Sequence, residues 1–279
     1  MKIFNSLILS ILLTNIGFAQ ELNIESELKA KIKWELSEKL NEISGIAYFN
    51  GKLYAINDSG NPHTLFELDT ISGKILKESM LENTQNIDWE SIDVLNNTLT
   101  IADIGNNYNT RDVFSLYTIN LNTKYQSAQK SELTLEGHIM SLGKTHDYDF
   151  EALFNDGKHH YLLSKNRASE NVKLYQIPLD GTKRRGAILQ EFKYPHLITG
   201  AHFHKNQLYF IAYSRKGNTY LSQVNYQNGN FDFENMISKK ISGPGYQIES
   251  ICLDDKNRIF IASEKTKLRK ASIMIFEWE

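Results

Sequence analysis

The sequence has 279 residues, of which 41% are apolar and only four are proline, and this composition excludes a disordered or collagen-like chain. Its 31 Lys and Arg residues stand against 33 Asp and Glu residues, for a net charge of −2. Because the chain carries no basic excess with which to follow a phosphate backbone, nucleic acid is not an expected partner.

The first 19 residues have the pattern of a secretory signal peptide. Lys2 supplies a positive start, residues 7–18 are mainly apolar, and the small residues Gly17 and Ala19 precede the expected cut. A membrane anchor would need roughly 20 uninterrupted apolar residues, whereas this run contains polar breaks. We therefore expect export to the periplasm or the extracellular space, no stable membrane insertion, and a single domain over residues 20–279.

The rest of the chain reads as an all-β protein built from repeats. Short alternating runs are separated by Asn, Asp and Gly, which is typical of strands and tight turns. Five segments, roughly 50 residues apart, share a polar residue, a small residue, an apolar strand, a turn, a second apolar strand and a polar loop. Their leading residues are Ser44, Glu90, Glu151, Thr199 and Glu249. This spacing predicts a five-bladed β-propeller; the alternative of six blades would need a sixth repeat, which the sequence lacks.

Further strand candidates complete the blades. Residues 63–69 with 74–80, and residues 173–178 with 187–193, predict outer strands. The fifth repeat is one strand short, because only residues 271–278 follow its second strand. Residues 31–36 alternate polar and apolar ahead of the first repeat and can supply the missing strand. We therefore expect the N-terminal strand to close the ring, which removes an open sheet edge.

The five leading residues predict a metal site on the propeller axis. Residues that open equivalent inner strands form a ring, and three carboxylates at one level repel unless some are protonated or a cation lies among them. All five side chains offer oxygen, which favours a hard ion, and calcium suits this loose ring better than magnesium. The alternative is that these residues simply face water in the channel mouth.

The same residues carry a resemblance to a known family. Glu42-Ile43-Ser44, Glu90, Phe150-Glu151-Ala152 and Glu249, together with residues 49–55 and 164–169, are similar to segments of the soluble calcium-activated nucleotidases, or apyrases. The resemblance implies a secreted five-bladed propeller with an axial calcium held by Ser and Glu side chains, which would map onto Ser44, Glu90, Glu151 and Glu249. Thr199 stands where that family would have a serine. The resemblance also implies hydrolysis of nucleotides or related phosphate esters.

Five polar loops are expected at the same mouth as the axial ring, because the loop after each second strand returns to the face where the first strand starts. We expect catalytic roles for Asp58, Asp103 and Arg167, since a carboxylate can hold a cation or orient a water and a guanidinium can contact phosphate. The expected ligand-binding residues are Asn106, Asn107, Lys165, Arg215, Glu264 and Lys265. The alternative is that these loops are ordinary turns, which need Asn, Asp and Gly for backbone reasons.

Two functions remain open from the sequence. The first is a metal-dependent phosphohydrolase acting on a small anionic, phosphate-bearing ligand, and the second is a non-catalytic propeller that binds a ligand or a protein through the same mouth. Other features favour structural roles: Cys252 reads as a buried small apolar residue, and residues 183–185 read as a solvated basic turn.

Overall fold

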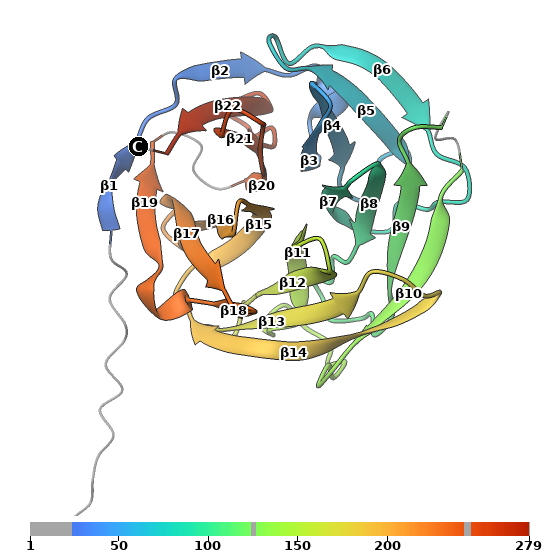
Figure 1. The fold of residues 1–279 in the computed structure, drawn as a ribbon, viewed down its shortest axis with the longest axis vertical. Coiled ribbons are helices and arrows are strands. Elements are labelled where there is room, and N and C mark those ends of the chain that lie inside the picture. The colour runs from blue at the N-terminus through green and yellow to red at the C-terminus, as the bar shows by residue number, and fades with distance from the viewer. Residues whose placement is uncertain (1–23, 124–126, 243–246, 279) are drawn as a thin grey trace, which may run out of the picture.

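The computed structural model describes residues 24–123, 127–242 and 247–278, so the predicted signal peptide lies outside the described residues. Five antiparallel blades surround one axis, each with its first strand innermost (Figure 1). The innermost strands are β3 (Ile43–Phe49), β7 (Trp89–Leu95), β11 (Asp149–Asn155), β15 (Leu197–His204) and β20 (Ile248–Leu253). The all-β, five-bladed prediction is confirmed.

The second strand of each blade follows the first through a turn of two to four residues, and the third strand follows through a loop of five to ten residues. The second strands are β4 (Lys52–Asn57), β8 (Thr98–Asp103), β12 (His159–Lys165), β16 (Gln207–Tyr213) and β21 (Arg258–Ser263). The third strands are β5 (Thr64–Asp69), β9 (Phe114–Asn120), β13 (Asn171–Pro178), β17 (Thr219–Gln227) and β22 (Ser272–Glu277). In the first hairpin, Asn50 and Gly51 both have positive φ, which matches the twist of the strands they join.

The outermost strands close the ring. They are β6 (Ile75–Met80), β10 (Gln129–Leu135), β14 (Lys183–Lys193), β19 (Ile237–Ile241) and β2 (Ile32–Glu35). Strand β2 pairs with β22, so the N-terminal segment completes the last blade as predicted (Figure 1). The chain also adds β1 (Ile24–Leu28) in parallel to β19, and a two-residue strand, β18 (Asn230–Phe231), beside β17. Two short 3₁₀ turns, η1 (Glu38–Leu40) and η2 (Phe233–Asn235), complete the fold.

One expectation about the third blade needs correction. Residues 183–185 are not a solvated turn, because they begin β14, which pairs in parallel with β10 of the neighbouring blade. Arg184 is buried there, and its guanidinium donates to the backbone oxygens of Gly181 and Pro178. The basic run is therefore part of a junction between two outer strands.

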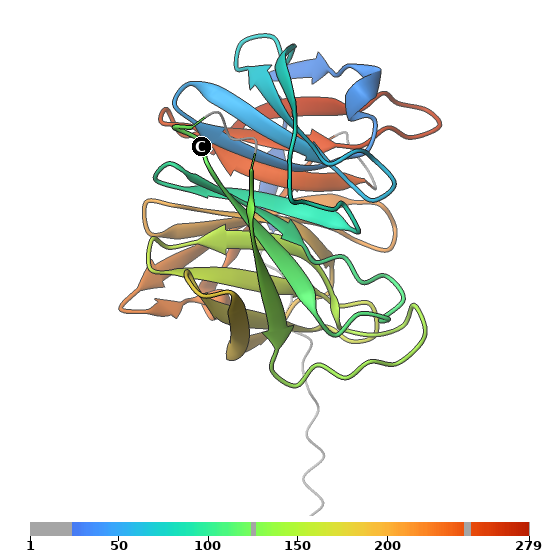
Figure 2. The same cartoon turned by 90° about the vertical axis from the view of Figure 1, so that its right-hand side faces the viewer.

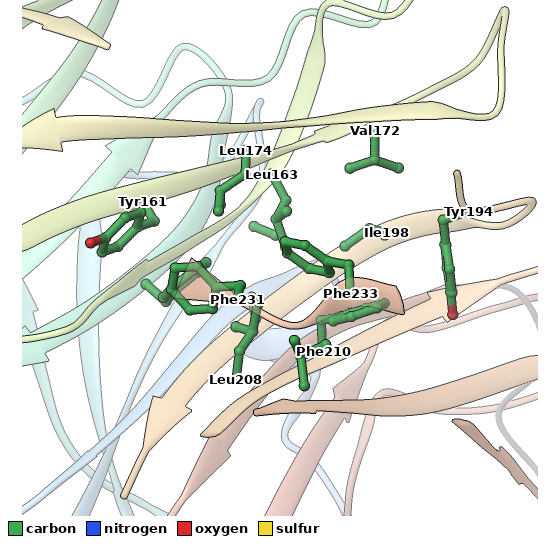
Figure 3. Close-up of a cluster of buried hydrophobic side chains, with 14 of the residues drawn as sticks. Tyr161, Leu163, Val172, Leu174, Tyr194, Ile198, Leu208, Phe210, Phe231 and Phe233 are labelled. Atoms are coloured by element: carbon green, nitrogen blue, oxygen red, sulfur yellow. The ribbon is translucent and has the colours of Figure 1, made fainter. Parts of the chain in front are cut away.

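Five hydrophobic clusters hold the ring together, one at each junction between neighbouring blades. Figure 3 shows the junction of the third and fourth blades, where side chains of β12 and β13 face side chains of β15 and β16, with Phe231 and Phe233 between them. Cys252 is buried in the junction between the last and first blades, in the apolar role that the sequence suggested.

Candidate functional site at the mouth of the propeller

A β-bulge interrupts the same point of every inner strand. In each case the pairing register skips one residue, and the five skipped residues are Ser44, Glu90, Glu151, Thr199 and Glu249. A bulge releases its residue from the strand ladder and re-aims the side chain. The five residues chosen from the repeat pattern therefore occupy one structural position around the axis.

The small residue after each bulge allows the inner strands to approach closely. A Cβ on Gly200 would lie 3.0 Å from the backbone oxygen of Glu249, and a Cβ on Gly45 would lie 3.0 Å from the backbone nitrogen of Ile92. Where serine replaces glycine, its hydroxyl joins two blades: Ser250 Oγ accepts from the Ile46 backbone N–H at 2.8 Å. The level of the ring is therefore fixed by direct strand-to-strand contact.

Asp58, Asp88 and Glu90 form an acidic cluster that could hold a metal ion. One carboxylate oxygen from each residue lies within 4.8 Å of the others. Asp58 follows β4 in the first blade, whereas Asp88 and Glu90 are at the start of β7 in the second blade. The site therefore joins two blades, and all its donors are carboxylate oxygens.

The electrostatics of this cluster favour a cation. Burial, followed by the negative charge of Glu151 and of Asp58, raises the pKa of Glu90 well above its ordinary value. Burial, followed by the charge and hydrogen bond of Asp58, raises the pKa of Asp88 to about 7. Burial also raises the pKa of Asp58. A divalent cation would compensate the negative charge that these buried carboxyls carry when ionised.

Gly105 forms the wall of the same cluster. A Cβ added to this residue would lie 2.6 Å from Glu90 Oε1 and closer still to the carboxylate of Asp88. The Gly105 and Ile104 backbone N–H groups both donate to the Asp88 backbone oxygen at 3.1 Å, which holds the glycine against the cluster. The absence of a side chain at residue 105 thus leaves room for the two carboxylates.

The third blade carries the same motif with cations already supplied by the protein. Asp149 and Glu151 are spaced like Asp88 and Glu90, but Arg167 Nη2 lies 2.6 Å from Asp149 Oδ2 and Lys165 pairs with Glu151 Oε1. Although burial opposes it, the negative charges of Glu151 and its neighbours raise the pKa of Lys165 above its ordinary value.

The acidic cluster lacks such internal cations. Within the described residues, the recorded ion pairs join no Lys or Arg to Asp58, Asp88 or Glu90. The two acidic pairs are therefore balanced differently: Arg167 and Lys165 form ion pairs with one, whereas, among the described residues, the other is influenced only through space, by the charge of Arg111 on Asp88.

Two buried oxygens at the bulges have no hydrogen-bond partner among the described residues. They are Glu151 Oε2 and Thr199 Oγ1, and both residues are almost fully buried. A buried polar atom without a partner carries a free-energy cost, which a bound ion, water or ligand group can offset. The Ser44 hydroxyl instead donates to the Trp89 backbone oxygen at 2.6 Å. Burial, followed by the charge of Glu151, raises the pKa of Glu249 well above its ordinary value.

The structure gives Asp103 and Asn106 structural positions. Asp103 is fully buried, its oxygens accept from the backbone N–H groups of Ile87 and Asp88, and Arg111 Nη2 lies 2.8 Å away. The Asn106 side chain donates to the Tyr148 and Arg111 backbone oxygens. Both side chains brace the loop around Gly105; the catalytic role expected for Asp103 and the ligand-binding role expected for Asn106 stay predictions.

The remaining predicted mouth residues lie closer to solvent. The Arg167 guanidinium is part-exposed and donates to Asn107 Oδ1 at 2.6 Å, while Arg215 Nη2 donates to the Arg167 backbone oxygen at 2.7 Å. Glu264 accepts from Gln247 Nε2, and burial raises its pKa to about 7. Lys265 is exposed. Loops of the second to fourth blades thus meet at Arg167.

Sequence reasoning missed Asp88, Asp149 and Arg111. The first two could have been found, because Asp88-Trp89-Glu90 and Asp149-Phe150-Glu151 repeat an Asp-x-Glu pattern at two successive inner strands. Arg111 carries no such signal, since its partner Asp103 lies in the preceding strand and only the folded loop brings them together.

No protein-family model and no curated protein matches the sequence. Solved structures show the fold. The glutaminyl cyclase of Myxococcus xanthus has a TM-score of 0.53 at 12% identity, over 90% of this chain and 97% of that chain. A putative oxidoreductase (glucose dehydrogenase) of Thermus thermophilus has a TM-score of 0.51 at 7% identity, over 88% of this chain and 99% of that chain. An engineered GH43 glycoside hydrolase has a TM-score of 0.54 at 9% identity, over 89% of this chain and 52% of that chain.

At these identities the likeness concerns the fold, which is that of propeller-like enzymes of different activities. The described residues also contain no helix that is both long and apolar enough to cross a bilayer.

Proposed function

We propose that the mouth binds a divalent cation through Asp58, Asp88 and Glu90. The observation that carries this proposal is the contrast between the two Asp-x-Glu pairs. In the third blade, Arg167 and Lys165 form ion pairs with the two acids, whereas no ion pair is recorded among the described residues for Asp88 or Glu90, and Arg111 acts on Asp88 only through space. The unpartnered Glu151 Oε2, and Glu249, which interacts electrostatically with Glu151, are further donors on the axis side of the cluster.

Calcium is the proposed ion. The donors are carboxylate oxygens, with the hydroxyls of Ser44 and Thr199 at equivalent positions of neighbouring strands, and no sulfur or imidazole takes part. Hard oxygen donors favour calcium or magnesium over zinc or copper. Calcium accepts irregular sets of six to eight oxygens, whereas magnesium demands an octahedron. An irregular set drawn from different blades suits calcium better.

We further propose that the ligand carries phosphate and that the protein is a metal-dependent phosphohydrolase related in mechanism to the apyrases. Asp149 and Asn107 fix the Arg167 guanidinium in a part-exposed position at the mouth. A guanidinium held this way can present its remaining N–H groups to phosphate oxygens. Arg215, bonded to the Arg167 backbone, and Lys265 add positive charge at the same rim. When bound, the cation would polarise a phosphoryl oxygen and lower the pKa of a coordinated water.

A hydrolysis screen tests this function. Purified protein would be incubated with nucleoside di- and triphosphates and with simple phosphate monoesters, in calcium, magnesium or EDTA. We expect phosphate release in calcium that EDTA abolishes. Arg167→Ala should lower kcat/KM at least tenfold, or about 1.4 kcal/mol of transition-state stabilisation.

The matched control is Arg185→Ala, which removes an exposed arginine from the outermost strand of the same blade. It should leave phosphate release unchanged. If the wild-type protein binds calcium but releases no phosphate from any of these compounds, the hydrolase proposal fails. The mouth would then be the site of a non-catalytic binding propeller.

A further inference from the structure

Two loops project from the mouth-side face and end in fully exposed leucines. The loop of residues 136–148 joins β10 to β11 and carries Leu142, which is 90% exposed. The loop of residues 264–271 joins β21 to β22 and carries Leu268, which is 93% exposed. Figure 2 shows both loops, yellow-green and dark red, reaching out from the same side of the ring. Exposing a leucine side chain to water is unfavourable in free energy, and burial against an apolar surface would remove this cost.

The first loop is held in place while it displays its apolar side chains. Asn109 is buried and donates through Nδ2 to the Ile139 backbone oxygen and to Ser141 Oγ, each at 2.9 Å. The His138 ring lies against those of Phe114 and Tyr148. Ile139 and Met140 nonetheless point to solvent, at 68% and 51% exposure. The structure therefore orders this loop without covering its apolar residues.

The second loop surrounds its leucine with positive charge. Thr266 Oγ1 accepts from the backbone N–H groups of Leu268 and Arg269, which fixes a turn with Leu268 at the tip. Lys265, Lys267 and Arg269 flank that tip and are exposed. In the first loop, exposed Lys144 follows Leu142 closely and lies over the Tyr108 ring at 4.7 Å. Leu268 thus has several exposed cationic residues next to it, and Leu142 has one, Lys144.

We propose that this face docks on an anionic lipid surface, with Leu142 and Leu268 entering the apolar layer and the neighbouring cations contacting lipid phosphates. An apolar tip flanked by Lys and Arg matches the two layers of a membrane interface, where acyl chains lie beneath negatively charged headgroups. An acidic protein partner would explain the cations but not two separated leucines at loop tips. This contact is peripheral and does not depend on the proposed hydrolase activity.

Sedimentation with vesicles tests the proposal. The full folded protein would be mixed with vesicles of equal parts phosphatidylglycerol and phosphatidylcholine, or of phosphatidylcholine alone, in EDTA and in calcium. We expect binding to the anionic vesicles that weakens with salt and persists in EDTA, where the acidic cluster carries no cation. Binding in EDTA separates this inference from the proposed metal site.

The double variant Leu142→Asp/Leu268→Asp should lower the vesicle partition coefficient at least tenfold. The double variant Lys267→Gln/Arg269→Gln should make binding to the anionic vesicles less dependent on salt. Ile71→Asp is the matched control, because Ile71 is 83% exposed at a turn on the opposite face. All three changes affect exposed side chains, so unchanged melting curves are expected. Absence of binding to anionic vesicles, retention of binding by the leucine variant, or equal loss with Ile71→Asp would overturn the proposal.

Discussion

The substitution Gly105→Ala tests the cation site without removing any of its ligands. Its added Cβ would lie 2.6 Å from Glu90 Oε1, whereas ordinary contacts begin at 3.4 Å, and the carboxylate of Asp88 is closer still. Both carboxylates must therefore withdraw by roughly 1 Å, several times the tolerance of about 0.2 Å for metal–ligand distances. Because Gly105 does not have a positive φ, alanine fits the backbone itself.

We expect the calcium dissociation constant of Gly105→Ala to rise by about 10- to 100-fold, which is the range seen when the support of a metal ligand is lost. Isothermal titration calorimetry measures this directly. Thermal unfolding gives a second reading, because calcium at about 100 times its dissociation constant should stabilise the wild-type protein by about 2.7 kcal/mol. In the variant, the same calcium concentration should give about 0.4 to 1.4 kcal/mol.

Two further variants make the result decisive. Glu90→Gln keeps the shape of the side chain and removes its charge, so it should weaken calcium binding even if Gly105→Ala perturbs the loop. Asp112→Asn removes an exposed carboxylate from the same loop and should bind calcium like the wild type. Wild-type affinity in both Gly105→Ala and Glu90→Gln would refute the assignment of the site.

Three other predictions concern stability and are measured by urea unfolding. Asp103→Asn should cost about 1–3 kcal/mol, because Arg111 loses its ion partner and one of the backbone N–H groups bonded to Asp103 loses its acceptor; unchanged stability would contradict the bracing role. Gly200→Ala should cost about 1–3 kcal/mol, since its Cβ would meet backbone atoms that cannot move aside; a neutral effect would show that the inner strands can separate. Burial lowers the pKa of His160 to about 3, so below pH 6.5 the unfolded chain binds a proton that the folded protein excludes, and stability falls as the pH drops. At pH 5 this loss is about 2 kcal/mol, which His160→Gln should abolish and His159→Gln should not.

The repeat pattern predicted the ring because its causes are local. Asn50 and Gly51 adopt the positive φ values of a tight hairpin, and small residues such as Gly45 and Gly200 stand where inner strands approach one another. The polar residue before each small one falls at a bulge, so its place on the axis follows from its position in the repeat. The turns, the small residues and the polar residues before them can all be recognised from residues that are adjacent in the sequence.

The parts of the fold and site that escaped prediction depend on contacts between distant segments. The pairing of Asp103 with Arg111 and the burial of Asp103 could not be read from the sequence, because both arise only when the loop folds back. The parallel pairing of β10 with β14 likewise joins two blades whose repeats carry no sign of it. Lys165 and Arg167 were predicted to act at the mouth, but the carboxylates that they neutralise, Glu151 and Asp149, could not be read from spacing.

The two Asp-x-Glu pairs give a physical reason why the proposed cation site and the proposed phosphate-binding residues can share one propeller mouth. Lys165 and Arg167 take up the charge of Glu151 and Asp149, and Arg167 remains part-exposed because Asn107 and Asp149 hold it at the rim. In the second blade, Asp103 and the Gly105 backbone oxygen hold Arg111, whose charge lowers the pKa of Asp88 against the larger effect of burial, but the recorded ion pairs of the described residues do not join Arg111 to Asp88 or Glu90. A symmetric ring with five equal carboxylates would attract cations alone. The unequal distribution of Lys and Arg between blades places a positive group beside the proposed cation site, as the proposed recognition of a phosphate ester would require.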